Sequence, residues 1–289
     1  MAGSANSVSE VELKFLLSAK SGSAVSVNPI FANGTSQAEL RSVYYDTPAW
    51  DLHKAGVSLR VRRKEGVYTQ TVKREAGQML FDRGEWEHRV GGKDPDPVAW
   101  ASTPAQNILE AKGVGELVPV FSTTVKRSSR IVKEGTSVVE VSLDRGQIVA
   151  GDLREAIEEV ELELKGGSAA GLFAVARRLA DETILRLSFD SKADRGYRLA
   201  AHESVAAAKA RPVHLRTGMS GGEAFMQVTR SCMTQVCTNA QRLREARNPE
   251  ILHQLRVGLR RLRAAFTAFK RILPARAANR LTVEIKWIG

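Results

Sequence analysis

Residues 9–16 read Ser-Glu-Val-Glu-Leu-Lys-Phe-Leu, a stretch in which charged and apolar residues alternate. In an extended strand successive side chains point to opposite faces, so Glu10, Glu12 and Lys14 share one face and the apolar residues share the other. The alternation predicts a β-strand with a buried apolar face and a charged face. A single strand of this kind is also typical of a solvated sheet edge.

The same alternation returns in later segments, with both signs of charge on one face. Half-buried antiparallel strands produce this pattern, and so does a sheet with an ordinary solvated outer face. Because the bases are mostly Arg and the acids form Glu-x-Glu pairs, we interpret the charged face as the aqueous lumen of a closed barrel. The residues in phase are Arg60 with Arg62, Thr71 with Lys73, Arg83 with Glu85 and Glu87, Glu140 with Ser142 and Asp144, and Glu159 with Glu161, Glu163 and Lys165.

Such a lumen suits a complex of metal and phosphate. Carboxylates two residues apart can share divalent cations, and hard ions such as Mg2+ or Mn2+ prefer oxygen ligands. Arg and Lys side chains that face them can bind phosphate oxygens, Arg in a bidentate manner. Internal salt bridges in an empty barrel are the alternative interpretation.

The charge of the chain is unevenly distributed. The net charge is +11, but residues 206–289 contain 16 Lys and Arg against 4 Asp and Glu, whereas residues 1–205 contain 27 against 28. A balanced first part fits a metal site, and a basic second part indicates an anionic partner. The sequence shows neither a signal peptide nor an apolar run long enough for a membrane, so we expect a cytoplasmic protein with no membrane association.

The order of the segments predicts an α+β protein. Strand-like segments fall near 8–16, 39–46, 57–64, 68–74, 81–89, 123–133, 137–149 and 155–165, with helical stretches near 95–112, 168–182 and 192–200. We therefore expect an eight-stranded antiparallel β-barrel (tunnel) with outer helices over residues 1–202. A linker is expected over 203–218 and an incomplete all-α helical domain over 219–289.

The basic part is predicted to be helical. Ser220 with Glu223 predicts a capping box for a helix that runs to about residue 247. Asn248 with Pro249 predicts the start of the next helix, which runs to about residue 273. On that helix four basic residues form one stripe without interleaved Glu, which favours a bound polyphosphate, and no aromatic platform accompanies them to favour nucleic acid. The stripe consists of His253, Arg256, Arg260 and Arg263.

These motifs resemble a known family. Glu10-x-Glu12-x-Lys14 resembles the signature of the CYTH superfamily, the triphosphate tunnel metalloenzymes, and the likeness covers nearly all of residues 8–200. It continues through Tyr44-Tyr45-Asp46-Thr47, Leu52-x-x-Ala55-Gly56-x-x-Leu59-Arg60-x-Arg62, Thr71-x-Lys73, Arg83-x-Glu85-x-Glu87, Glu140-x-x-x-Asp144-x-Gly146, Glu159-x-Glu161-x-Glu163-Leu164-Lys165 and Ser191-Lys192-x-x-Arg195-Gly196-Tyr197. Residues 253–263 resemble the opening of a CHAD domain, a helical module associated with polyphosphate, and the resemblance stops before the second helical half of that module.

The resemblance implies a tunnel that holds a linear triphosphate along a row of bases, namely Lys14, Arg41, Arg60, Arg62, Lys73, Arg83, Arg127, Arg130 and Lys192. It also implies two divalent cations, Mg2+ or Mn2+, held by the acidic residues Glu10, Glu12, Asp144, Glu159, Glu161 and Glu163. Glu161 or Glu163 would take the proton of an attacking water, and Lys14 is a further candidate catalytic residue.

The pairing of CYTH and CHAD motifs resembles bacterial inorganic triphosphatases, which implies hydrolysis of inorganic triphosphate to phosphate and pyrophosphate. The four Tyr and four Trp show no cluster beside the basic motifs that could bind a base or a thiazolium ring. An adenylyl cyclase of the class IV type and a thiamine triphosphatase remain alternatives. A non-catalytic polyphosphate-binding protein is the alternative outside enzymes.

Overall fold

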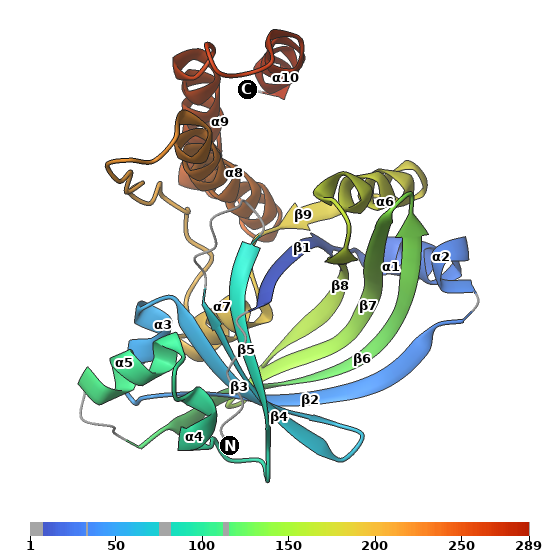
Figure 1. The fold of residues 1–289 in the computed structure, drawn as a ribbon, viewed down its shortest axis with the longest axis vertical. Coiled ribbons are helices and arrows are strands. Elements are labelled where there is room, and N and C mark those ends of the chain that lie inside the picture. Colours follow the sequence, from blue (N-terminus) through green and yellow to red (C-terminus); the bar gives the residue numbers. More distant parts are fainter. Residues whose placement is uncertain (1–7, 33, 75–81, 112–115, 289) are drawn as a thin grey trace. The chain divides into compact units, whose positions relative to one another are not determined.

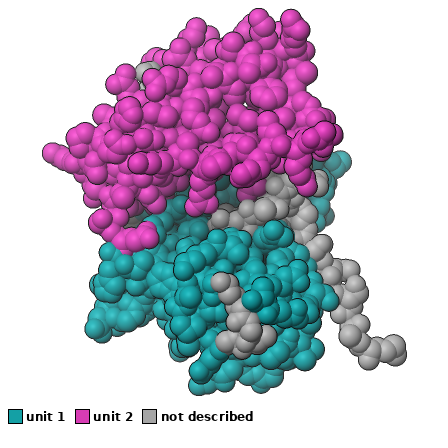
Figure 2. All heavy atoms as spheres, turned by 90° about the vertical axis from the view of Figure 1, so that its left-hand side faces the viewer, with its two compact units in different colours: residues 1–77, 81–202 teal, residues 78–80, 203–289 magenta. Residues whose placement is uncertain are grey.

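The computed structural model describes residues 8–32, 34–74, 82–111 and 116–288 (Figure 1). The chain forms two compact units (Figure 2), here called the barrel unit, up to His202, and the helical unit, from Glu203 onward. Within the described ranges, none of the helices is both long enough and apolar enough to cross a membrane.

A closed ring of antiparallel strands forms the barrel unit. Its described strands are β1 (Val8–Leu16), β2 (Ser36–Asp46), β3 (Val57–Lys64), β4 (Val67–Arg74), β5 (Asp82–Val90), β6 (Val118–Glu134), β7 (Ser137–Ala150), β8 (Leu153–Gly166) and β9 (Arg186–Ser188). They pair in the order β5-β4-β3-β2-β6-β7-β8-β1-β9, and β1 also pairs with β5. The first eight strands therefore close a barrel, which confirms the predicted antiparallel tunnel, and the short β9 is a ninth strand that the sequence pattern did not indicate.

Helices cover the outside of the ring (Figure 1). They are α1 (Ala19–Val27), α2 (Pro29–Ala32), α3 (Asp51–Lys54), α4 (Pro97–Trp100), α5 (Pro104–Ala111) and α6 (Ala169–Glu182), whereas α7 (Lys192–Ala200) lies on the lumen side of the strands. The predicted helix near 95–112 is divided into α4 and α5, because Ala101 is extended and Ser102 has a φ of 64°, and Pro104 then begins a new helix.

Two apolar clusters lie outside the barrel wall. The first joins α1, α2 and α6 to β1, β7 and β8, and includes Leu13, Val141, Leu162 and Leu172. The second joins α3, α4 and α5 to β3 and β4, and includes Leu59, Val72 and Trp100. In β1, β3 and β8 the strand residues of these clusters alternate with charged or polar residues on the other face. The wall is thus apolar toward the helices and charged toward the lumen.

The ladder registers show which residues share the lumen face. Residues directly opposite each other in a ladder point to the same side of the sheet. The face can be followed around the ring through Lys14 and Glu161, Glu159 and Asp144, Asp144 and Arg127, Ser42 and Arg62, Arg60 and Thr71, and Lys73 and Glu85.

Helix α7 packs against the lumen side of β6, β7 and β8. Its Tyr197 belongs to an apolar cluster with Phe121, Ile148 and Ile157, which lie on the same strand faces as the lumen charges. Gly196 allows this close approach, because a Cβ built there would lie 2.1 Å from the Phe121 ring. The charged residues at the start of α7 are thereby fixed beside the strand carboxylates.

The helical unit consists of α8 (Gly221–Glu245), α9 (Pro249–Ala268) and α10 (Ala275–Ile288), with a small core of Cys232, Leu259, Leu262 and Ile285. Ser220 and Glu223 form the capping box at the start of α8, and Asn248 caps α9. The segment before α8 is attached to it, since the Asn239 amide pairs with both the N–H and the C=O of Ala208 at 3.0 and 2.8 Å.

Candidate active site

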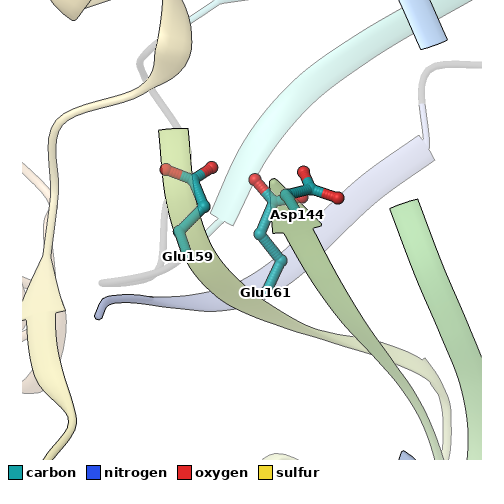
Figure 3. Close-up of side chains that lie close together, drawn as sticks. All are labelled: Asp144, Glu159 and Glu161. Carbon is teal, nitrogen blue, oxygen red and sulfur yellow. The ribbon is translucent and has the colours of Figure 1, made fainter. Parts of the chain in front are cut away.

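Three carboxylates from neighbouring strands meet on the lumen face. Asp144 comes from β7, and Glu159 and Glu161 come from β8 (Figure 3). Each offers an oxygen within 4.8 Å of those of the other two. Asp144 and Glu159 are fully buried, and Glu161 is 15% exposed. We call these three residues the acidic cluster.

Four cationic side chains surround the acidic cluster. Lys192 Nζ lies 2.7 Å from Asp144, 2.5 Å from Glu159 and 3.0 Å from Glu161. The other three approach from different elements: Arg127 of β6 donates two hydrogen bonds to Asp144 and one to Glu161, Lys14 Nζ lies 3.3 Å from Glu161, and Arg195 Nη1 donates to Glu159 at 3.1 Å. Burial without such partners would be costly for each carboxylate.

The cations determine the protonation of Glu161 and Asp144. Burial alone would raise the pKa of Glu161, but the charges of Lys192, Lys14 and Arg127 outweigh it and hold that pKa well below its usual range. The pKa of Asp144 is lowered in the same way, mainly by Lys192 against the effect of burial. Both groups are therefore carboxylates at neutral pH and can act as anionic ligands.

The opposite side of the lumen carries a second set of bases, from β3 and β4. Arg60 Nη2 lies 3.6 Å from Glu85, and Lys73 Nζ lies 3.2 Å from the same carboxylate. Arg62 donates from Nε to Ser42 Oγ at 3.2 Å. Burial raises the pKa of Tyr44, but Arg60 and Arg62 outweigh it and lower that pKa. This side of the lumen has more positive charge than the described acids neutralise.

A cavity of about 250 Å³ is lined by one base of each set, Arg127 and Arg62. Burial and the nearby Arg60 and Arg127 lower the pKa of Arg62 to about 10. The Nε of Arg60 is buried and has no hydrogen-bond partner among the described residues. A multivalent anion in the cavity would supply the opposite charge that Arg62 lacks. Its lining includes Arg62, Lys64, Thr69, Glu87, Arg127 and Glu140.

Helix α7 is held in place by contacts that the local sequence pattern did not assign to the site. Ser191 and Asp194 form a capping box at its start. Tyr197 donates its hydroxyl proton to Asp46 at 2.7 Å, and Asp46 also accepts the backbone N–H groups at the start of α3. Arg195 bridges Glu159 and Glu155. These residues occurred in motifs of the sequence, but their roles depend on contacts between distant segments.

Two of the predicted triphosphate ligands do not face the lumen. Arg41 lies opposite Arg63 in the β2–β3 ladder, is 65% exposed and pairs with Glu39 on the outer face. Arg130 lies opposite the outer-core residue Val141, and its guanidinium donates to the carbonyl oxygens of residues 29 and 30. Arg41 and Arg130 therefore lie on the outer face of their strands, and the predicted row of lumen bases is corrected to exclude them.

The remaining predicted acids and bases of the barrel lie in β1, β5 and β8. Glu12 is directly opposite Glu163 in the β1–β8 ladder, and Lys165 Nζ lies 2.5 Å from Glu163. Glu10 is opposite Arg83 in the β1–β5 ladder, and the side chains of these two lie outside the described part of the molecule. The predicted stripe of the helical unit is exposed on α9, at His253, Arg256, Arg260 and Arg263.

The acidic cluster fits a divalent cation by its chemistry. It offers three carboxylate oxygens close together, the donor type that Mg2+ and Mn2+ prefer. Glu12 and Glu163 face each other next to it on the same lumen face. The surrounding Lys and Arg side chains would compensate the phosphate charge that such ions commonly accompany.

Comparison with known proteins gives two family matches. The model of the CYTH domain matches residues 9–197, and the model of the CHAD domain matches residues 227–289. A protein named inorganic triphosphatase from Haemophilus influenzae is 29% identical over 198 residues, which are 67% of this chain and 56% of that protein. The chain thus spans little more than half the length of this relative.

Two of the solved structures that match this chain have low sequence identity to it. A candidate adenylate cyclase from Bacillus halodurans is 16% identical with a TM-score of 0.45, and the match covers 64% of this chain and 96% of that one. The PH1819 protein from Pyrococcus horikoshii is 18% identical with a TM-score of 0.43, covering 64% and 97%.

Proposed function

This chain belongs to the CYTH domain family, and from that premise we propose that it is a divalent-metal-dependent hydrolase that converts inorganic triphosphate to phosphate and pyrophosphate. The observation that carries the proposal is the excess of buried positive charge at Arg62, whose pKa is lowered by burial and by the nearby Arg60 and Arg127, beside a cavity and near a cluster of three carboxylates. The name of the Haemophilus influenzae relative supports the same substrate class.

The basic side chains of the lumen bind and orient the substrate. Arg62 and Arg127 line the cavity, and Arg60 and Lys73 lie on the same face of the adjoining strands. Guanidinium groups bind phosphate oxygens in a bidentate manner, so a linear triphosphate is held along the wall with its negative charge compensated. Phosphoryl transfer depends mainly on such positioning and charge stabilisation.

The acidic cluster, with Glu12 and Glu163 and with Glu10 of β1, would hold the divalent ions. We propose Mg2+ or Mn2+, and two ions, on the basis of the number of carboxylates. When bound, such ions neutralise phosphate charge and lower the pKa of a bound water. Because its pKa is low, Glu161 remains a carboxylate that can act as a metal ligand, and it is a weak base.

Glu163 is therefore the better candidate for the general base. In the proposed step a water oxygen attacks the terminal phosphorus, its proton passes to the Glu163 carboxylate, and the bond to the bridging oxygen breaks. The bridging oxygen leaves with the electron pair as part of pyrophosphate. Lys14 and Lys192, which contact Glu161 at 3.3 and 3.0 Å, are placed to stabilise developing negative charge nearby.

Hydrolysis assays test this function. We expect the protein to release orthophosphate from tripolyphosphate with Mg2+ or Mn2+, and EDTA to abolish the release. Glu161→Gln should lower kcat by at least a hundredfold and Lys126→Gln, on the outer face, should not change it. Formation of cyclic AMP from ATP would favour the cyclase alternative, and faster hydrolysis of thiamine triphosphate would change the substrate. Binding of tripolyphosphate without turnover under either metal would favour a receptor.

The exposed basic stripe on α9 supports a second role for the helical unit. We propose that Arg256, Arg260 and Arg263, with His253, attach the protein to polyphosphate. A variant with the three arginines changed to Gln should elute earlier from immobilised polyphosphate and keep its rate of tripolyphosphate hydrolysis. Equal retention of both proteins would exclude this role. We also propose a cytoplasmic location, where the free thiols of Cys232 and Cys237 would stay reduced.

A further inference from the structure

The ammonium group of Lys192 lies inside the acidic cluster. Its Nζ is 2.7 Å from Asp144 Oδ2, 2.5 Å from Glu159 Oε1 and 3.0 Å from Glu161 Oε1. An ammonium has three N–H donors, and here each can be directed to a different carboxylate. The Lys192 side chain is 8% exposed, so protein rather than solvent surrounds this cation.

Lys192 differs in this respect from the other cations near the cluster. Arg127 reaches Asp144 and Glu161, whereas Arg195 reaches Glu159. Among the described side chains only Lys192 has an ion pair with all three carboxylates. Its Nζ therefore occupies the position from which one positive charge can satisfy the whole cluster.

A divalent cation held by the same three oxygens would compete for that position. Metal–oxygen distances of about 2.0–2.6 Å would place the ion close to where Nζ now lies. Two cations so close at reduced dielectric repel each other strongly. The acidic cluster can therefore hold either the Lys192 ammonium or a divalent ion through these three oxygens, and not both.

The side chain can leave the cluster without movement of its helix. Lys192 is the first residue of α7, and the helix is fixed independently by the Ser191–Asp194 capping box and by the hydrogen bond from Tyr197 to Asp46. The Lys side chain has a flexible four-carbon stem, whereas the Arg127 guanidinium is held by two parallel hydrogen bonds to Asp144. Rotation about the bonds of the Lys192 stem would therefore move Nζ out of the cluster while α7 stays in place.

We propose that Lys192 is a tethered counter-ion that occupies the divalent-cation position of the acidic cluster, and that a metal ion enters by displacing it. The proposal rests on the proposed metal-dependent function and deepens it. A displaced ammonium needs another anion, and a phosphate chain in the lumen provides one. Metal and triphosphate therefore bind cooperatively. The metal frees the Lys192 ammonium to bind the phosphate chain, and the phosphate chain supplies the anion that the displaced ammonium needs.

Equilibrium binding of Mn2+ to the full chain, without any phosphate, tests the exchange. Free Mn2+ is followed by its electron paramagnetic resonance signal during titration of wild type, Lys192→Met, Lys192→Arg and Lys126→Met. We expect Lys192→Met to bind Mn2+ at least tenfold more tightly than wild type. Lys192→Arg retains a cation and should show no tightening. Lys126→Met removes the same charge from the exposed outer face of β6 and should match wild type.

Equal or weaker Mn2+ binding by a folded Lys192→Met protein would overturn the proposal. Lys192→Met leaves three buried carboxylates with fewer cations, so Lys192→Gln, which keeps two N–H donors, is the second variant and should also tighten Mn2+ binding. The rise in Tm on adding Mn2+ should be larger for both variants than for wild type. These measurements need no turnover. A wild-type protein that hydrolyses no triphosphate would contradict the proposed function. The exchange of Lys192 for a metal ion would then still be decided by the Mn2+ affinities.

Discussion

Replacement of Arg62 by Gln should weaken triphosphate binding and at the same time stabilise the ligand-free protein. Arg62 lines the lumen cavity, and burial together with Arg60 and Arg127 lowers its pKa to about 10. This lowering of the Arg62 pKa from the usual value of an arginine means that the charged form is disfavoured by about 3 kcal/mol. Water in the open cavity reduces this figure, so we expect a net gain of about 1–2 kcal/mol in the free energy of unfolding.

The effect on the ligand has the opposite sign. A hydrogen bond from a charged donor contributes about 1.5–3 kcal/mol, so loss of the Arg62 guanidinium should weaken tripolyphosphate binding roughly 10- to 150-fold. Isothermal titration calorimetry in EDTA measures the affinity without turnover, and urea unfolding without ligand measures the stability. Arg41→Gln is the matched control, because Arg41 lies on the neighbouring strand but is 65% exposed on the outer face.

The reasoning would be refuted by either of two results. If Arg62→Gln unfolds at a lower urea concentration than wild type, the lumen cations are not in excess in the ligand-free state. If the variant binds tripolyphosphate as tightly as wild type, Arg62 does not contact the anion. An equal loss of affinity in Arg41→Gln would show that the effect is not local to the lumen.

Three further changes test the supports of the site. Gly196→Ala places a methyl group against the Phe121 ring and should lower the free energy of unfolding by about 1–3 kcal/mol, measured by urea denaturation, with a fall in hydrolysis as α7 shifts. Tyr197→Phe removes the 2.7 Å hydrogen bond to Asp46 and should cost about 1 kcal/mol in the same assay. The pKa of Glu161 is lower in the folded state than its unfolded value of about 4.5, so its carboxylate stabilises the fold above pH 4.5 and loses that contribution as the pH falls. Wild type should therefore lose stability below pH 4.5 more steeply than Glu161→Gln. Acid titrations followed by circular dichroism measure this difference.

The alternation of residue types predicted the lumen wherever one face of a strand is purely apolar. In β8 the outer residues Val160 and Leu162 contrast with Glu159 and Glu161, and in β3 Leu59 and Val61 contrast with the arginines between them. The period of two then determines which residues face inward. Both the closed barrel and the acidic cluster follow from these strands.

The alternation fails in β2, where both faces carry apolar residues. Leu40 and Tyr44 pack with α7 on the lumen side, whereas Val43 and Tyr45 pack against the outer helices. The strand phase of Arg41 therefore could not be determined from the residues around it. A basic residue in such a strand can be assigned to a face only when the pairing with the next strand is known.

The contacts that fix α7 could not be predicted because they join segments far apart in the chain. The hydrogen bond from Tyr197 to Asp46 spans 151 residues, and the ion pair of Lys192 with Asp144 spans 48. Helical periodicity places Tyr197 on a face of α7 but gives no information on the strand that receives it. The resemblance to the CYTH superfamily singled out these residues, and the structure shows the contacts that they make.

The pairing of β1 has a consequence for biosynthesis. This strand leaves the ribosome before the other strands of the barrel, and Glu161, which lies opposite its Lys14, is translated 147 residues after that lysine. At about 5–20 residues per second the strand waits roughly 7–30 s for β8. During that interval its backbone could pair with other nascent chains, and the alternating charges of Glu12 and Lys14 oppose such pairing. The charges that face the lumen of the finished barrel would thus also oppose aggregation of the nascent polypeptide.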